Sequence, residues 1–218
     1  MKKLICFDLD DTLIYSDKCH LTAYDYALKE FKIKIKKPKF MVSLFGMPHR
    51  RLIEIIAPEL SKEQIEKTAK VHDYLLIKKT YKYAKQIPGA IKTLEILKKY
   101  YNLALLSNCS HSNIIALLKG AKINRRYFKL IIGNDDVKHG KPWPDEIFKA
   151  EHLDHSKPNF MVGDSIYDMI AGKRAGIKAI GVLTGHTSSM LLKKQGADYV
   201  IKSVSELPKL LKKINSKD

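Results

Sequence analysis

Two aspartates, Asp8 and Asp10, stand in the segment FDLDDTL (7–13), directly after the apolar run of residues 4–7. A short apolar run bounded by polar residues is typical of a buried parallel strand. The carboxyl end of such a strand lies at the sheet edge where open α/β folds bind ligands. Carboxylates at this spacing suit a nucleophile with an acid/base neighbour, or two ligands of one metal ion. An Asp-rich turn that satisfies its own backbone or caps a helix is the alternative left open by this segment alone.

Ser107 and Asn108 follow a second apolar run, residues 103–106. A hydroxyl and an amide at a strand end can bind phosphate oxygens together with backbone N–H groups, although Ser-Asn is also an ordinary turn pair. Lys141 lies in GKPWPD (140–145), where two prolines stiffen the chain ahead of a predicted helix that Asp145 could cap. This lysine is either a fixed positive charge or one of many surface lysines.

Asp164 and Asp168 stand in MVGDSIYD (161–168), after the predicted strand 160–162 and at the start of a helix. Residues four apart share one helix face, and carboxylates are favourable at a helix N-terminus. A simple N-cap explains Asp164 but leaves Asp168 unexplained. We therefore interpret Asp164 as a candidate metal ligand and Asp168 as its support.

These four groups all fall at or just beyond a predicted strand end, so one sheet edge can bring them together. Carboxylates crowded there repel, by about 4 kcal/mol for a pair ~4 Å apart at an effective dielectric of ~20. A divalent cation relieves that repulsion, and hard oxygen ligands favour Mg²⁺. The sequence thus predicts a magnesium site, with Lys141 and Ser107 placed where a phosphate can lie.

The elements expected to position these groups alternate along the second half of the chain. Strand-like runs alternate with helical periodicity from Pro88 onward, which predicts an α/β fold with a doubly wound parallel sheet. Residues 16–86 differ, because they show helical spacing and a capping box at 61–64 that opens a helix expected to reach about residue 83. We expect a core of residues 1–15 and 87–218 and an all-helical insert, residues 16–86, without a second strand.

The bulk composition limits the function further. The 218-residue chain has 40 Lys and Arg against 23 Asp and Glu, a net charge of +17, and 45% of its residues are hydrophobic. The insert carries 16 Lys and Arg against 8 Asp and Glu, a net charge of +8. Basic residues are spread along the chain without aromatic interleaving, so we expect a solvated surface and no nucleic-acid partner. Three unpaired cysteines, no membrane-length apolar run and no signal peptide predict a cytoplasmic protein that does not bind membranes.

The four groups, in their order and spacing, resemble the motifs of the haloacid dehalogenase superfamily, over nearly the whole length of the chain. The insert resembles the C1 cap of that family and the rest its Rossmann-like core, with the phosphoglycolate phosphatase and β-phosphoglucomutase branch as the nearest likeness. Asp11 occupies a position that is often glycine in the family. Dehalogenases of the superfamily lack the second acid of the first motif, so Asp10 favours phosphate chemistry.

The resemblance implies that Asp8 attacks phosphorus to form an aspartyl-phosphate, while Asp10 protonates the leaving oxygen and later activates water. A free aspartate titrates near 3.9, so Asp8 is expected to be ionised at neutral pH. Mg²⁺ would be held by the Asp8 carboxylate, the Asp10 backbone carbonyl and Asp164, with Asp168 supporting the site.

The resemblance also implies a phosphate site and a cap loop. Phosphoryl oxygens would be bound by Ser107, Asn108 and Lys141, and Thr12 would keep the first-motif loop in shape. The segment FGMPHRR (45–51) resembles the cap's specificity loop, in which Gly46 allows a tight turn and Arg50 or Arg51 binds an anionic substrate group. A helix start with exposed arginines is the alternative. His20 matches a hinge histidine of several relatives, or is an ordinary surface residue.

The leading hypothesis is a magnesium-dependent phosphatase of small phosphorylated metabolites, with 2-phosphoglycolate as the first candidate and a monomer or homodimer as the expected state. A sugar-phosphate mutase and an inorganic pyrophosphatase use the same chemistry and remain open. A mutase requires an aspartyl-phosphate that survives until it is passed to a sugar, and the sequence does not report that lifetime. A basic nucleic-acid-binding protein with an inactive site is the remote alternative.

Overall fold

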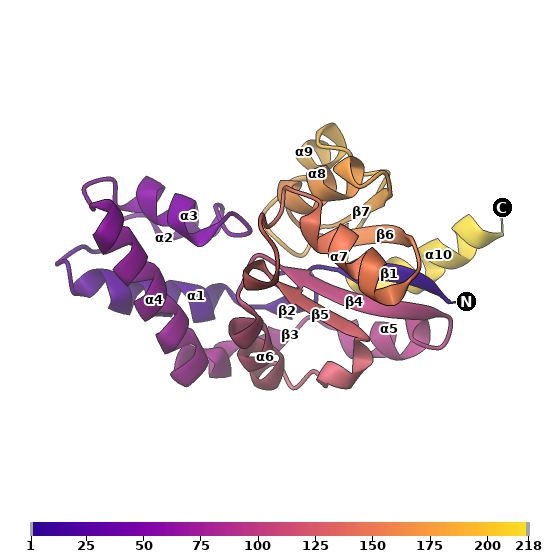
Figure 1. The fold of residues 1–218 in the computed structure, drawn as a ribbon, viewed down its shortest axis with the longest axis horizontal. Coiled ribbons are helices and arrows are strands. Elements are labelled where there is room, and N and C mark those ends of the chain that lie inside the picture. Colours follow the sequence, from indigo (N-terminus) through magenta and orange to yellow (C-terminus); the bar gives the residue numbers. More distant parts are fainter. Residues whose placement is uncertain (1, 217–218) are drawn as a thin grey trace.

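The computed structural model describes residues 2–216 and contains a central sheet of six parallel strands in the order β5-β4-β1-β6-β7-β8 (Figure 1). Its strands are β1 Lys3–Phe7, β4 Tyr101–Ser107, β5 Leu130–Gly133, β6 Pro158–Gly163, β7 Lys178–Val182 and β8 Tyr199–Ile201. Each lies on a predicted strand, and the predicted α/β fold with a doubly wound parallel sheet is confirmed. Because β1 lies between β4 and β6, the strand ends that carry the candidate residues are neighbours.

Both faces of the sheet are covered by helices, which explains why its strands read as continuous apolar runs. The core helices are α5 Ala90–Leu97, α6 His111–Gly120, α7 Asp145–Asp154, α8 Ile166–Arg174, α9 Ser189–Lys194 and α10 Leu207–Asn215. In β1, Ile5 and Phe7 pack on one face with α5, α6 and α10, whereas Leu4 and Cys6 pack on the other with α7 and α8.

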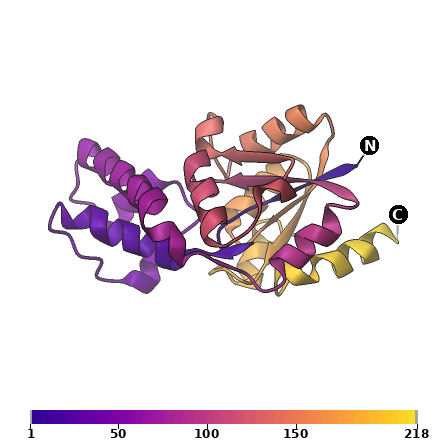
Figure 2. The same ribbon diagram turned by 90° about the horizontal axis from the view of Figure 1, so that it is seen from below.

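The segment between β1 and α5 forms a separate helical layer beyond one end of the sheet (Figures 1 and 2). It contains α1 Asp17–Lys29, α2 Pro38–Val42, α3 His49–Ile56 and α4 Lys62–Lys78. These helices pack on one another through their own apolar cluster, which includes Tyr24, Leu52 and Ile65. The predicted capping box is confirmed, since the Ser61 hydroxyl accepts from the Gln64 N–H and the Gln64 side chain accepts from the Ser61 N–H.

The expectation that residues 16–86 lack a strand is wrong at their end. The short strand β3 Lys85–Gln86 pairs antiparallel with β2 Ile14–Tyr15, so the chain leaves and re-enters the core through two paired connections. A two-residue strand is too short for any periodic pattern and exists only through its partner. The preceding helix α4 also ends earlier than expected, at Lys78, and a 3₁₀ turn, Thr80–Tyr83, follows it.

The structure corrects the predicted cap at Asp145 and rules out the N-cap alternative for Asp164. Asp145 is the first residue of α7 rather than its cap, and its carboxylate accepts from the backbone N–H of His139. The cap of α8 is Ser165 rather than Asp164. Within residues 2–216, none of the helices combines the length and apolar character that crossing a membrane requires.

Candidate active site

The carboxyl ends of β1, β4 and β6 and the helical layer together enclose one cavity. Its wall includes the side chains of Asp8, Asp10, Ser107, Asn108, Lys141 and Asp164 from the core, and of His20, Tyr24, Phe45 and His49 from the helical layer. Asp8 continues the β1 ladder, because its N–H donates to the Val162 carbonyl at 2.8 Å. The backbone ladder therefore fixes where the Asp8 carboxylate emerges.

Lys141 joins three of the predicted groups by direct contacts. Its Nζ lies 2.6 Å from Asp8 Oδ1 and 2.7 Å from Asp168 Oδ1, and it also donates to the Leu106 carbonyl at 3.1 Å. The side chain is almost completely buried. Burial alone would lower the pKa of Lys141, but Asp168 and Asp8 hold it well above its usual value. This lysine is therefore a fixed cation inside the site and not a surface lysine.

Three carboxylates, those of Asp8, Asp164 and Asp168, offer oxygen atoms within 4.8 Å of one another. Burial raises the pKa of Asp8 to about 8, although Lys141 opposes that shift. Burial and the repulsion from Asp8 also hold the pKa of Asp164 well above its usual value. The expectation that Asp8 ionises as a free carboxyl group does therefore not hold for these side chains alone. Their ionised form requires more positive charge than Lys141 supplies.

Asp168 is held in place by the start of α8. The Ser165 hydroxyl and backbone N–H donate to its Oδ2 at 2.5 and 3.1 Å, which completes a capping box. Gly163 is required here, because a Cβ at that position would lie 2.3 Å from Asp168 Cγ. The capping box fixes one carboxylate oxygen of Asp168 and leaves the other to contact Lys141. These two contacts explain why the segment GDSIYD carries a second acid, Asp168, after Asp164.

The first-motif loop is held by neighbours on both sides. The Thr12 hydroxyl donates to Asp164 Oδ1 at 3.2 Å, so Thr12 links this loop to the fourth motif. Asp11 has φ +53°, in the left-handed region that glycine and, less readily, aspartate adopt. This conformation explains how Asp11 fits a position that is often glycine.

Asp10 faces the helical layer. Its Oδ1 lies 3.3 Å from His20 Nε2, and the Cys109 thiol donates to its Oδ2 at 3.5 Å. Burial alone would raise the pKa of Asp10, but the contact with His20 holds it below its usual value. Cys109 stays a thiol, because burial raises its pKa well above the usual value.

The side chains of Ser107 and Asn108 both form hydrogen bonds with backbone groups around the site. The Ser107 hydroxyl accepts from the backbone N–H of Cys109 at 3.1 Å. The Asn108 amide donates to the Lys141 carbonyl at 2.9 Å and to the Gly46 carbonyl at 2.7 Å, so it ties the β4 end to the loop before α3. Its buried Oδ1 accepts no hydrogen bond from the described residues. Gly46 has φ +92° and packs closely on Ser165.

Arg50 is not brought to the cavity with the other predicted residues. Its side chain is exposed and pairs with Glu66, to which its Nη2 donates at 2.9 Å. Arg51 forms a similar exposed pair with Glu54. His49, the residue before them and the first residue of α3, lines the cavity instead.

Several polar residues around Asp10 carry no sequence signal. His72 and Asp73 lie on α4, and His20 Nδ1 is 3.2 Å from His72 Nε2. Asp73 Oδ1 in turn lies 3.0 Å from His72 Nδ1 and accepts from the Asn113 amide of α6 at 2.7 Å. A lone histidine on a helix gives no pattern to detect, and only the packing of α1 against α4 reveals this network.

Comparisons with known proteins show which proteins this chain is similar to. The family model described as haloacid dehalogenase-like hydrolase matches residues 5–182. A phosphoglycolate phosphatase of Aquifex aeolicus is 31% identical over 212 residues, covering 96% of each chain. The pyrophosphatase PpaX of Anoxybacillus flavithermus is 29% identical over 209 residues, covering 95% of each. A hydrolase from Pseudomonas syringae superposes with a TM-score of 0.83 at 26% identity, covering 98% of this chain and 99% of that one.

The family model spans most of the chain, from β1 to β7, and therefore includes all four motif groups and the helical layer. The hypothesis drawn from those motifs is thereby confirmed: this chain is a hydrolase that belongs to the haloacid dehalogenase-like family.

Proposed function

We propose that this protein is a magnesium-dependent phosphatase that hydrolyses small phosphomonoesters through an aspartyl-phosphate on Asp8. The observation that carries the proposal is the contact of Lys141 with both Asp8 and Asp168 at the wall of a cavity shared with Asp10 and Asp164. A nucleophilic carboxylate, a second acid and a buried cation are the groups that phosphoryl transfer requires.

In the proposed reaction, an Asp8 carboxylate oxygen attacks phosphorus while the bond from phosphorus to the leaving oxygen breaks. Asp10, which its contact with His20 keeps ionised, takes up a proton through that contact and passes it to the leaving oxygen, and it then accepts a proton from the water that hydrolyses the aspartyl-phosphate. Lys141, the Ser107 hydroxyl and the Asn108 amide stabilise the charge that develops on the phosphoryl oxygens. Thr12 and Ser165 keep Asp164 and Asp168 oriented.

A divalent cation fits the acidic group of the site. Phosphatases of this family are generally metal-dependent, and we propose Mg²⁺ because the available ligands are hard oxygens. Asp8, Asp164 and the Asp10 carbonyl would hold the ion, and Asp168 would support it. When bound, the cation supplies positive charge against the transferring phosphoryl group. Three buried carboxylates beside a single lysine support this assignment.

We propose residues 16–86 as a cap domain that covers the site, with the paired strands β2 and β3 as its connection to the core. The wall that it contributes contains polar and apolar groups, among them Ser43, Phe45 and Leu52. Lys141 is the only lysine or arginine among the described residues that line the cavity. A small substrate with one phosphate is therefore favoured, and 2-phosphoglycolate is the first candidate.

Inorganic pyrophosphate is the second candidate, because a relative of similar identity is named a pyrophosphatase. We further propose a small phosphorylated metabolite as the partner, a cytoplasmic location, and a monomer or homodimer. The three cysteines are free and buried, which supports a reducing compartment.

The test is phosphate release from 2-phosphoglycolate, sugar phosphates, nucleotides and pyrophosphate, with and without Mg²⁺, for the wild type and Asp8→Asn. We expect magnesium-dependent release that Asp8→Asn lowers by about 10⁴-fold or more, because no other group forms the covalent bond. Asp25→Asn, on an exposed carboxylate of α1 paired with Lys29, is the matched control. Release that survives in Asp8→Asn, or no release from any compound, contradicts the proposal, and the preferred compound identifies the substrate class.

A further inference from the structure

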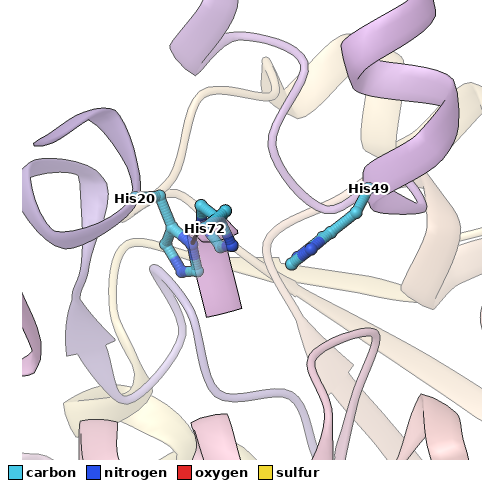
Figure 3. Close-up of side chains that lie close together, drawn as sticks. All are labelled: His20, His49 and His72. Atoms are coloured by element: carbon cyan, nitrogen blue, oxygen red, sulfur yellow. Dashed lines mark hydrogen bonds between the residues drawn. The ribbon is translucent and has the colours of Figure 1, made fainter. Parts of the chain in front are cut away.

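Three histidines gather on the cap side of the cavity. His20 comes from α1, His49 from the start of α3 and His72 from α4, and their rings face a common region (Figure 3). One nitrogen of each lies within 4.8 Å of the others, and His20 Nδ1 is 3.2 Å from His72 Nε2. His20 and His72 are buried and His49 is partly buried.

Each of the three rings also contacts a carboxylate. His20 Nε2 lies 3.3 Å from Asp10, His72 Nδ1 lies 3.0 Å from Asp73, and His49 Nδ1 lies 3.5 Å from Asp73. Histidines that bind metals usually donate their second N–H to a carboxylate or carbonyl in this way. The arrangement therefore supplies the outer contacts of a metal site as well as its candidate ligands.

The contact between His20 Nδ1 and His72 Nε2 lacks an obvious donor when the other nitrogen of each ring donates to a carboxylate. With His20 Nε2–H directed at Asp10 and His72 Nδ1–H directed at Asp73, the two facing nitrogens either share one added proton or bring two lone pairs together. A cation placed between the rings would turn both lone pairs into ligands, and both N–H groups would keep their carboxylate acceptors.

We propose that His20, His49 and His72 form a binding site for a borderline transition-metal ion of the Zn²⁺ type. Imidazole nitrogens suit such ions, whereas Mg²⁺ prefers oxygen ligands. Bonds of about 2.0–2.1 Å in a tetrahedral site place two ligand nitrogens about 3.3 Å apart, close to the separation of His20 and His72. Three protein ligands leave a fourth position for water.

This site is separate from the acidic centre around Asp8 and does not depend on the proposed function. His20 and His49 both line the cavity, which gives an ion a path to the cluster. The bound ion would connect α1, α3 and α4 of the cap. The ion would also be linked to Asp10 through the His20 ring, whose Nε2 contacts the Asp10 carboxylate.

The test is titration of the chelator-treated full-length protein with Co²⁺ in excess Mg²⁺, followed by competition with Zn²⁺. We expect one equivalent of Co²⁺ with the strong visible absorption of a four-coordinate site, displacement of that absorption by Zn²⁺, and a higher melting temperature. The excess Mg²⁺ keeps the acidic centre occupied, so the spectrum reports the histidine cluster.

His49→Gln is the main variant, because His49 is only partly buried and its loss should leave the fold intact. We expect it to abolish the absorption and the rise in melting temperature. His152→Gln, on an exposed residue of α7, is the matched control and should retain both. An absent absorption in the wild type, or an absorption unchanged in His49→Gln, overturns the proposal.

Discussion

The two walls of the cavity are built in different ways. On the core wall, Asp8 and Asp164 directly follow strands and Ser107 is the last residue of one, so the hydrogen-bond ladders fix their position. On the cap wall, His20 and His49 come from separate helices, and the buried His72 of a third helix contacts His20 without lining the cavity; side-chain contacts with one another and with two carboxylates fix all three. The core wall is therefore specified locally by sequence, whereas the cap wall exists only after the helices pack.

The difference extends to charge. The core wall concentrates carboxylates around a single buried lysine, and burial raises the pKa of Asp8 and Asp164. On the cap wall, burial lowers the pKa of His72 to about 3 and also lowers that of His49, so both rings are neutral at pH 7. One wall is suited to a hard cation and a phosphate, and the other to neutral ligands. Variants that act on one wall alone can test this division.

After Asp8→Asn, the largest effect is expected from Lys141→Met. This change removes the buried cation that contacts Asp8 and Asp168 and would face the transferring phosphoryl group. We expect kcat to fall by about 10²–10³-fold, as for other losses of preorganised charge. Phosphate release measures the effect, and circular dichroism checks the fold. Lys149→Met, on a half-buried lysine that donates to the Asp136 carbonyl, is the control. A wild-type rate in Lys141→Met would restrict this lysine to a structural role.

The second prediction concerns pH and the divalent cation. In the folded protein the pKa of Asp8 is raised from 3.8 to about 8, and that of Asp11 to about 9. Between about pH 4 and pH 8 the folded state therefore binds protons that the unfolded state has lost. Below about pH 6.5 the lowered pKa values of His72 and His49 act in the opposite direction, so the free energy of unfolding should decrease clearly between about pH 6.5 and pH 8 when no divalent cation is present.

Mg²⁺ should reduce this slope, because it favours the ionised form of Asp8 and Asp164, and at 100 times its Kd it should add about 2.7 kcal/mol. Urea unfolding at about pH 6.5 and about pH 8, with Mg²⁺ or with a chelator, measures both effects. Asp164→Asn should weaken the response to Mg²⁺. An identical pH slope with and without Mg²⁺ would contradict the assignment of the cation to the core wall.

The same contrast separates the features that could be predicted from the sequence from those that could not. The six strands, the capping box at Ser61 and the group around Lys141 were predictable, because apolar runs, caps and strand ends leave local patterns. The strand β3 and the contacts of His72 with His20 and Asp73 were not, since they arise from pairing between distant segments. The substrate role of Arg50 stays a prediction, although its contact with Glu66 turns it away from the cavity.

The third prediction compares two glycines with positive φ, Gly46 at +92° and Gly176 at +67°. An alanine at either position costs about 1–2 kcal/mol of backbone strain. At Gly46 the new Cβ would also lie 3.2 Å from the Ser165 Cβ, whereas at Gly176 it would meet no atom within 4 Å. We expect both variants to be less stable and only Gly46→Ala to raise KM, because it displaces the cap loop that Asn108 holds. Equal KM values would show that this loop does not contact the substrate.

The smallest effects are expected from two capping boxes, one on each side of the cavity. Ser61 caps α4 in the cap and Ser165 caps α8 in the core, and both hydroxyls accept from a backbone N–H three residues later. Ser61→Ala and Ser165→Ala should each lower the free energy of unfolding by about 1 kcal/mol. Only Ser165→Ala should also lower kcat, because the Ser165 hydroxyl donates to the Asp168 oxygen opposite the one that contacts Lys141. Urea unfolding measures the free energy of unfolding of both variants, and phosphate release measures their kcat. If Ser61→Ala lowered kcat by the same factor, local stability rather than the position of Asp168 would account for the loss, and the two walls would not act separately.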